Sequence, residues 1–369
     1  MKFDGTPSFE LDHRPFFSIV IAVYNGRKFL PRILNSIISQ DLREDIEVIL
    51  CDDHSPDECH DVIEQFANDI CIKWVQTDYN CCPGNTRERG IQEVTGEWLM
   101  ICDQDDELVS DTLLDIKYTL EREQPRYYAY SNFREVWDRE GGYQKASNLI
   151  RNMNTNTGWN HGKFYNMDNL WRKYNVHFVK DMKSHEDIYI SSIMNVLMEI
   201  LEAKPLHISI YTYIWYKRPG SITNTNYKVD GKDHQFLEIY FNDYVRSTSG
   251  AVKEQFFAGN LKGKENFLKG SMIDTVLYQY FYAQSFIFHA EVQDKSQELL
   301  ERNIGICRNE LVEAKLITHM KNKDFYDIAK ANDAERYAAV YDSARMGAGN
   351  CIPKYTFLQW LDYLNKDPE

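Results

Sequence analysis

The sequence predicts an α/β protein whose mostly parallel, doubly wound sheet is flanked by helices and followed by an appended helical segment. Strand-length apolar runs alternate with segments of helical period from Phe16 onward, and short polar turns separate them. Repeated βα units of this kind connect through right-handed crossovers into a parallel sheet. After Asn224 the sequence becomes aromatic-rich and helical in period, with few prolines. A chain of 369 residues holds about two domains at roughly 100–200 residues each, and we expect them at 1–232 and 233–369.

The first strand is expected over 17–23, where a continuous run of apolar and β-branched residues is typical of a strand buried on both faces. Tyr24-Asn25-Gly26 ends this run. Apolar residues then recur at helical spacing from Phe29 to Ile38, which predicts the first helix. The same reasoning predicts strands over 46–51, 71–76 and 97–102, and helices over 59–67 and 85–94.

The pattern continues in the second half of this region. A helix is expected over 112–123 and a strand over 127–133, followed by a Gly- and Asn-rich surface connection over 141–162. Helical spacing returns over 167–174 and 186–201, and a β-branched segment follows over 207–216.

Charge and composition exclude several classes of protein. The chain carries 42 Lys and Arg against 56 Asp and Glu, a net charge of −14, and an acidic surface repels polyphosphate. Met1–Arg14 lacks the apolar core of a secretory signal. Val276–Ala290 is interrupted by polar residues and is shorter than the ~20 residues of a membrane helix. The eight cysteines lack C-x-x-C spacing, which favours reduced thiols over disulfides or a zinc site. We therefore expect a cytoplasmic protein without a transmembrane segment.

Asp103-Gln104-Asp105-Asp106 is the most informative motif, because it directly follows a predicted buried strand. Close carboxylates repel one another unless a positive group lies between them. A divalent cation bound by oxygen ligands, and shared with substrate phosphates, is one explanation. The alternative is an acidic turn that caps the next helix.

Two other polar turns follow strands of the same predicted sheet. Tyr24-Asn25 follows the first strand and Asp52-Asp53 the second, and ligands of such sheets bind at the carboxyl ends of the strands. Asp53 can accept an N–H from a nucleobase, or it can serve an Asx turn. Arg87 lies on the helix opened by Pro83-Gly84 and can face a phosphate or a base.

Glu186-Asp187 opens a further helical segment. Acidic residues at a helix start commonly compensate the helix dipole. The functional alternative is a general base that removes the proton of an attacking hydroxyl.

Together these motifs resemble those of the inverting glycosyltransferases of family 2, which have the GT-A (Rossmann-like) fold. The resemblance covers about 17–223. It rests on five motifs in order: Val23-Tyr24-Asn25, Asp52-Asp53-His54-Ser55, Asp103–Asp106, Glu186-Asp187, and the Tyr…Arg-Pro-Gly-Ser-Ile segment Tyr213–Ile222.

The resemblance implies a role for each motif. The donor would be a nucleotide-sugar, most commonly a UDP-sugar. The nucleotide would contact the residues Ala22, Tyr24, Asn25, Asp53, Arg87 and Asp103. Separately, Arg218 can close over the diphosphate, or it can lie on a solvated turn before Pro219-Gly220. Asp105, with Asp103 beside it, would bind Mn²⁺ or Mg²⁺ that bridges the diphosphate, and Asp187 would be the catalytic base. Trp159, His161 and Lys163 would lie near the sugar and the acceptor.

The family often has Ala-Arg-Asn before a glycine in the helix after the third strand, whereas this chain has Thr86-Arg87-Glu88 ahead of Gly90. The arginine is kept, and Glu88 stands in place of the expected Asn. The acceptor is expected to be a saccharide. Alternatives are a hydroxymethylated or already glycosylated base of phage DNA, and a non-catalytic sugar-binding module. The helical domain is expected to bind the acceptor or to form a homo-oligomer.

Overall fold

The computed structural model describes residues 9–137, 150–154, 156–217 and 243. The chain divides into two compact units. The first combines Met1–Met182 with Glu202–Thr225, and the second combines Lys183–Leu201 with Asn226–Glu369.

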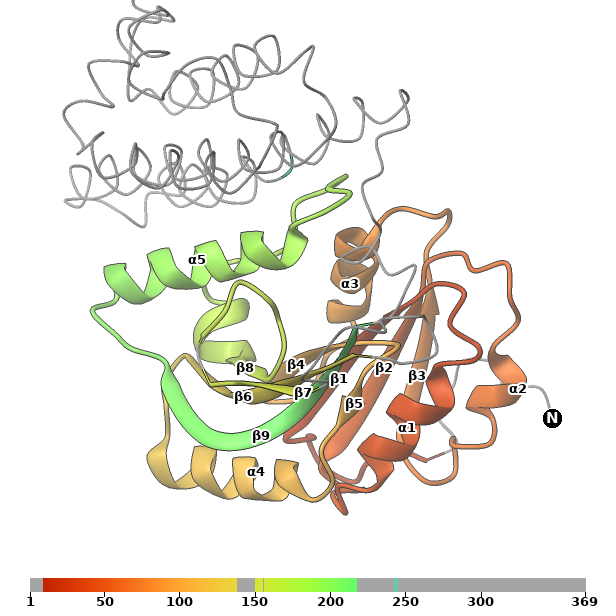
Figure 1. Cartoon of the computed structure of the whole chain (residues 1–369), viewed down its shortest axis with the longest axis horizontal. Coiled ribbons are helices and arrows are strands. Elements are labelled where there is room, and N and C mark those ends of the chain that lie inside the picture. The colour runs from red at the N-terminus through yellow and green to blue at the C-terminus, as the bar shows by residue number, and fades with distance from the viewer. Residues whose placement is uncertain (1–8, 138–149, 155, 218–242, 244–369) are drawn as a thin grey trace, which may run out of the picture. The chain divides into compact units, whose positions relative to one another are not determined.

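The elements of the first unit make one sheet with helices around it (Figure 1). In chain order they are β1 (Phe17–Val23), α1 (Leu30–Ile38), β2 (Ile46–Asp52), α2 (His60–Ile63), β3 (Cys71–Gln76), α3 (Pro83–Ile91), β4 (Trp98–Asp103), β5 (Glu107–Leu108), α4 (Thr112–Glu123), β6 (Tyr128–Trp137), β7 (Ile150–Met153), β8 (Lys163–Asn166), the π-helical turn η2 (Met167–Trp171) and β9 (Leu206–Lys217).

The amino-terminal half of the sheet is parallel, in the order β3-β2-β1-β4. Register places Ala22 of β1 between Cys51 of β2 and Asp103 of β4. The three strands therefore end at the same edge, which confirms the expected convergence of their polar turns.

The other half of the sheet is mixed. β8 pairs antiparallel with β4 and β6, β9 pairs parallel with β6, and β5 pairs antiparallel with β9. β7 adds a further antiparallel pair to β6. The α/β class is confirmed, but antiparallel pairing is more extensive than expected, because β5 and β8 are too short for their periodicity to be recognised.

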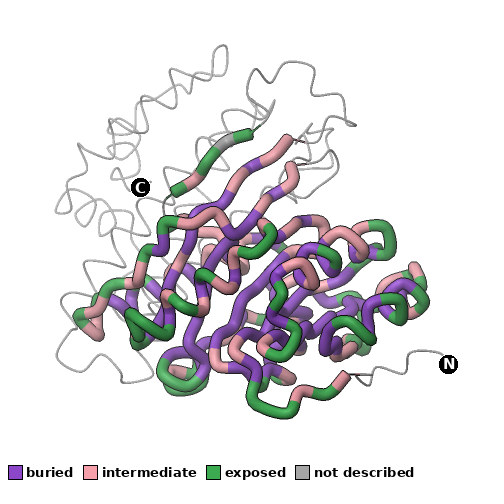
Figure 2. The backbone as a smooth tube through the Cα atoms, turned by 90° about the horizontal axis from the view of Figure 1, so that it is seen from below, coloured by how far each residue is buried: buried purple, intermediate pink, exposed green. Residues whose placement is uncertain are grey.

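Helices cover both faces of the parallel half. Ile19 and Ile21 of β1 share a core with Ile33 and Ile37 of α1. On the opposite face, a Cβ added to Gly90 of α3 would lie 3.0 Å from a methyl group of Val20, so the glycine allows α3 to approach the sheet closely. The central strands β1, β2 and β4 are buried along nearly all of their length. Figure 2 shows these buried stretches inside the unit and exposed segments at its surface.

Three of the expected helices have different bounds. The segment expected over 59–67 contains only α2, followed by hydrogen-bonded turns as far as Ile70. α3 begins two residues earlier than expected, at the proline, and ends at Ile91. Over 167–174 the helix is a π-helical turn, capped by the Asn166 side chain, which accepts a hydrogen bond from the N–H of Asn169.

In the second unit, α5 (Glu186–Ile200) has the start expected from the sequence. Buried Asp243 holds the segment before it: one carboxylate oxygen accepts the N–H groups of Lys183 (2.8 Å) and Ser184 (3.1 Å). Within the described ranges, no helix has the length and apolarity needed to cross a membrane.

Candidate active site at the carboxyl edge of the sheet

The turn Asp103–Asp106, called the acid turn below, follows the end of β4 and is fixed to β9. The hydroxyl of Tyr213 donates to Oδ2 of Asp106 (2.7 Å) and accepts the N–H of Asp103 (3.0 Å). The N–H of Tyr216 donates to Oδ1 of Asp106 (2.9 Å). Asp106 is 1% exposed, whereas the side chain of Asp103 is 37% exposed. The turn therefore has one buried carboxylate and one that solvent can reach.

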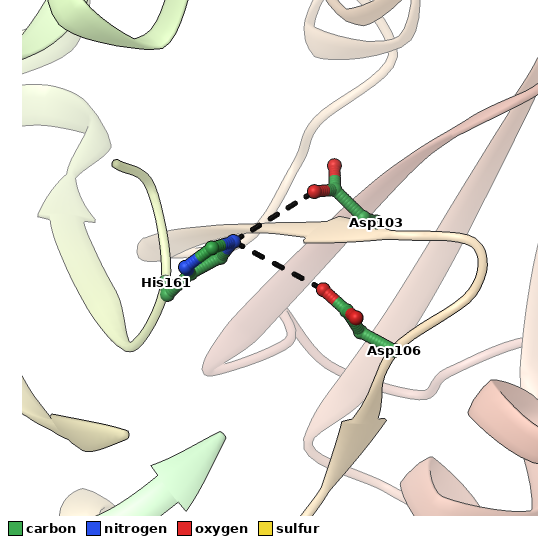
Figure 3. Close-up of side chains that lie close together, drawn as sticks. All are labelled: Asp103, Asp106 and His161. Carbon is green, nitrogen blue, oxygen red and sulfur yellow. Dashed lines mark ion pairs between the residues drawn. The ribbon is translucent and has the colours of Figure 1, made fainter. Parts of the chain in front are cut away.

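His161 brings an imidazole to this turn from the loop before β8 (Figure 3). Its Nε2 lies 3.8 Å from Oδ2 of Asp103 and 4.0 Å from Oδ2 of Asp106. The residue is 7% exposed, and its Nδ1 is buried without a hydrogen-bond partner among the described residues. The ring stacks on that of Tyr213, with centroids 4.9 Å apart.

The pKa values of the Asp106 and Asp103 carboxyl groups are shifted in opposite directions. Burial raises the pKa of Asp106 well above its usual value, and the charges of Asp103 and Asp105 raise it further. Burial opposes ionisation of Asp103 as well, but Arg87 and His161 outweigh it and hold the pKa of that carboxyl well below its usual range. A cation bound between the two would relieve the charge on both.

The geometry of Asp103, Asp106 and His161 fits a small divalent cation. One ligand atom from each lies within 4.8 Å of the other two. Ligands bound at about 2.0–2.6 Å from one ion are separated by about 3–5 Å. The sequence predicted Asp103 and Asp105 as the metal ligands. In the structure Asp106 and His161 join Asp103, and the Asp105 carboxylate is outside this group.

The main chain of Asp105 is held from another side. Its carbonyl oxygen accepts a hydrogen bond from the Arg32 guanidinium, which stacks over the ring of Tyr216. The acid turn is thus fixed by α1 and by β9.

The residues predicted to hold the nucleobase lie at the ends of β1 and β2. The amide of Gln104 in the acid turn binds both polar backbone groups of Tyr24, accepting its N–H (3.0 Å) and donating to its carbonyl oxygen (2.8 Å). Asn25 donates its N–H to the Ser55 hydroxyl (3.2 Å). The backbone of Ala22 is beside Asp103 in the sheet register.

Asp53 is buried beneath the segment after β3. Its carboxylate accepts the N–H of Cys81 (2.7 Å), the hydroxyl of Thr77 (3.3 Å) and the amide of Asn80 (3.2 Å). These contacts fix the carboxylate within the row of strand ends that includes Tyr24.

Arg87 and Glu88 of α3 have separate partners. Arg87 donates to Oδ1 of Asp103 (2.7 Å), so the predicted nucleotide-binding arginine is already joined to the acid turn. Glu88, the departure from the family pattern, is a structural residue: its carboxylate accepts the N–H of Phe178 (3.0 Å), and burial raises its pKa.

Asp187 is in the first turn of α5 in the second unit, and its Oδ1 accepts the N–H of Ile188 (2.8 Å). His185, before it, has a left-handed backbone (φ 61°), and burial lowers its pKa to about 4. The role of Asp187 as a base stays a prediction. Arg218 and the predicted domain over 233–369, apart from Asp243, lie outside the described residues.

Sequence reasoning did not find the role of His161 in this cluster, nor that of Tyr213. His161 is 58 positions after Asp103 by residue number, and only the pairing of β8 with β4 and β6 brings it near. Tyr213 was recognised as part of a motif, but its hydroxyl contacts depend on the register of β5 with β9.

Comparison with known proteins identifies related sequences. The sequence profile described as "Glycosyl transferase family 2" matches residues 18–184. Poly(ribitol-phosphate) beta-N-acetylglucosaminyltransferase TarS of Staphylococcus aureus is 32% identical over 101 residues, 27% of this chain and 18% of TarS. UDP-Glc:alpha-D-GlcNAc-diphosphoundecaprenol beta-1,3-glucosyltransferase WfaP of Escherichia coli is 31% identical over 120 residues, 31% of this chain and 45% of WfaP. This chain thus spans less than half of either relative.

A solved structure shares the fold over most of the chain. The crystal structure of residues 1–349 of S. aureus TarS in complex with UDP has a TM-score of 0.57. Its sequence identity is 18%, and the match covers 90% of this chain and 91% of that one. At this identity the likeness shows the fold alone, which is the GT-A fold.

Proposed function

We propose that this chain, whose residues 18–184 belong to glycosyl transferase family 2, transfers a sugar from a UDP-sugar to a hydroxyl of a saccharide-type acceptor. The observation that carries the proposal is the meeting of Asp103, Asp106 and His161 at the strand edge that also carries Tyr24. This edge is the proposed common site of a cation, a diphosphate and a nucleoside.

Uridine is the proposed nucleoside. The name of WfaP includes UDP-Glc as its donor, and the TarS fragment was crystallised with UDP. In this chain Asp53 is the proposed acceptor for a base N–H, and Tyr24 and Asn25 are proposed to contact the base and the ribose. The half-exposed carboxylate of Asp103 and the arginines Arg87 and Arg218 are proposed to face the ribose and the diphosphate.

The proposed cation is Mn²⁺ or Mg²⁺, held by Asp103, Asp106 and His161, which lie together in the structure. Asp105, whose carboxylate is outside this group, stays a further ligand proposed from the sequence. An imidazole ligand favours Mn²⁺, because Mg²⁺ prefers oxygen ligands throughout. When bound, such an ion neutralises charge that develops on a departing diphosphate.

Asp187 is the proposed general base. It accepts the proton of the acceptor hydroxyl as that oxygen attacks C1 of the sugar. The bond between C1 and the diphosphate oxygen breaks, UDP leaves with the electron pair, and the configuration at C1 inverts. Residues 233–369 are proposed to bind the acceptor or to form a homo-oligomer.

A cytoplasmic location is part of the proposal. Among the described residues, Cys51, Cys59, Cys71, Cys81 and Cys102 are thiols outside any disulfide, as suits a reducing compartment.

The test is a thermal-shift panel of nucleotide sugars with and without Mn²⁺, followed by product analysis with the best ligand. A ligand that binds only the native state stabilises it, by about 2.7 kcal/mol at a ligand concentration a hundredfold above Kd. The melting temperature rises as a result. We expect UDP-sugars to stabilise the protein more than GDP-sugars, and Mn²⁺ to increase the effect. A panel in which no uridine nucleotide shifts the transition would refute the proposal.

A further inference from the structure

Tyr213 contacts every member of the group formed by Asp103, Asp106 and His161. Its hydroxyl donates to Oδ2 of Asp106, the same oxygen that faces Nε2 of His161. That hydroxyl also accepts the N–H of Asp103, and the ring stacks on the imidazole at an interplanar angle of 21°. The side chain is completely buried, so water cannot replace these contacts.

Each of these contacts of Tyr213 fixes the position of a different member of the group. The donated hydrogen bond orients the carboxylate of Asp106, and the accepted one fixes the main chain from which the Asp103 carboxylate projects. The stacked ring limits rotation of His161, whose Nε2 is directed between the two carboxylates (Figure 3). Without the hydroxyl, two close carboxylates would move apart through like-charge repulsion.

We propose that Tyr213 is a positioning residue that sets the spacing of Asp103, Asp106 and His161 and thereby the affinity of this turn for a divalent cation. The inference rests on the proposed function, because it takes the cation site of the acid turn as given. It goes further by assigning that affinity to a residue that is not one of the proposed ligands but contacts each of them. Outer groups that orient metal ligands typically change metal affinity by about 10–100-fold when removed.

The test uses Tyr213→Phe, which keeps the ring and its stacking but removes the hydroxyl. The matched control is Tyr128→Phe, another buried tyrosine of the same sheet, whose hydroxyl accepts a hydrogen bond from the Asn156 amide instead. The full-length proteins are titrated with Mn²⁺, free Mn²⁺ is followed by its EPR signal, and circular dichroism verifies folding.

We expect Tyr213→Phe to weaken Mn²⁺ binding about tenfold or more, and Tyr128→Phe to change it less than about twofold. In an Asp106→Asn background the effect of Tyr213→Phe should shrink to less than about twofold, because residues that act through one another are not additive. UDP affinity measured without metal should be unchanged. Raising the Mn²⁺ concentration should restore the transfer rate of Tyr213→Phe, which a general structural defect would not allow.

Native-like Mn²⁺ affinity in Tyr213→Phe would overturn the inference, and so would a full tenfold loss in the Asp106→Asn background. If the native protein binds UDP but takes up no Mn²⁺, the cation site itself is refuted. If it binds neither, the proposed function fails as a whole.

Discussion

Glu47 anchors the amino-terminal edge of the sheet and offers a direct test of how the fold is held. This carboxylate at the start of β2 is 1% exposed. Its Oε2 accepts Lys73 Nζ (2.7 Å) and the hydroxyl of Thr95 (2.9 Å). Its Oε1 accepts the hydroxyl of Ser18 (2.5 Å) and the N–H groups of Thr95 (2.6 Å) and Gly96 (3.0 Å).

Replacing Glu47 with Gln puts an NH₂ group in place of one carboxylate oxygen. Oε2 accepts two hydrogen bonds and Oε1 accepts three, so the NH₂ group would face donors in either position. At best the amide nitrogen takes the Oε2 position, where the threonine hydroxyl can rotate and Lys73 loses its carboxylate. Breaking a buried pair costs about 3–5 kcal/mol. Lys73 is 26% exposed and recovers part of this from water, so we expect a loss of about 2–4 kcal/mol in the free energy of unfolding.

The effect should depend on pH. Burial raises the pKa of Glu47, but the hydrogen bonds from Lys73, Ser18 and Thr95 outweigh it and lower the pKa below its usual 4.5. A lowered folded pKa gives stability that is present above the unfolded pKa and is lost as pH falls through the folded value. The difference between native protein and Glu47→Gln should therefore be full at pH 7 and shrink below about pH 4.5.

Urea unfolding followed by tryptophan fluorescence at pH 7 and pH 4 measures both effects, with exposed Glu44→Gln as the control. A variant within about 0.5 kcal/mol of the native protein at pH 7, the range of ordinary surface substitutions, would contradict the reasoning.

Three other variants test the site and the fold. Asp187→Asn should lower kcat by about 10²–10⁴-fold with UDP-sugar affinity retained, because the variant removes only the proposed base; near-normal turnover would exclude Asp187 from that role. Asp53→Ala should weaken UDP binding about tenfold or more in calorimetry, since a charged hydrogen bond contributes about 1.5–3 kcal/mol, and unchanged affinity would remove Asp53 from the base site. Gly96→Ala should lower the free energy of unfolding by about 1–3 kcal/mol, because the new Cβ would collide with the Ser18 hydroxyl and lie 3.0 Å from the Ser18 backbone nitrogen. The urea midpoint measures this loss, and an unchanged midpoint would show that Ser18 moves aside freely.

The parallel half of the sheet was predictable because its strands are long, apolar and bounded by polar turns. β1 and β3 have the expected bounds, and the acid turn follows β4 at the expected edge. The grouping of Asp103, Asp106 and His161 was not predictable, because it depends on long-range pairing that leaves little local signal. β8, which has four residues, positions His161, and a two-residue strand fixes the turn against Tyr213.

The hydrogen bonds of Asp243 have a practical consequence for anyone who shortens the gene. Ending translation at codon 232, where the sequence pattern changes, would remove the carboxylate that receives the main-chain N–H groups of Lys183 and Ser184. Ser184 is buried, and a buried N–H group left without an acceptor costs about 1–3 kcal/mol. The loss would fall on the residues just ahead of Asp187, so we expect the truncated protein to keep its affinity for the proposed donor and to turn over slowly. Comparing the turnover of the truncated protein with that of full-length Asp243→Ala would separate the loss of these two hydrogen bonds from the loss of the other residues after 232.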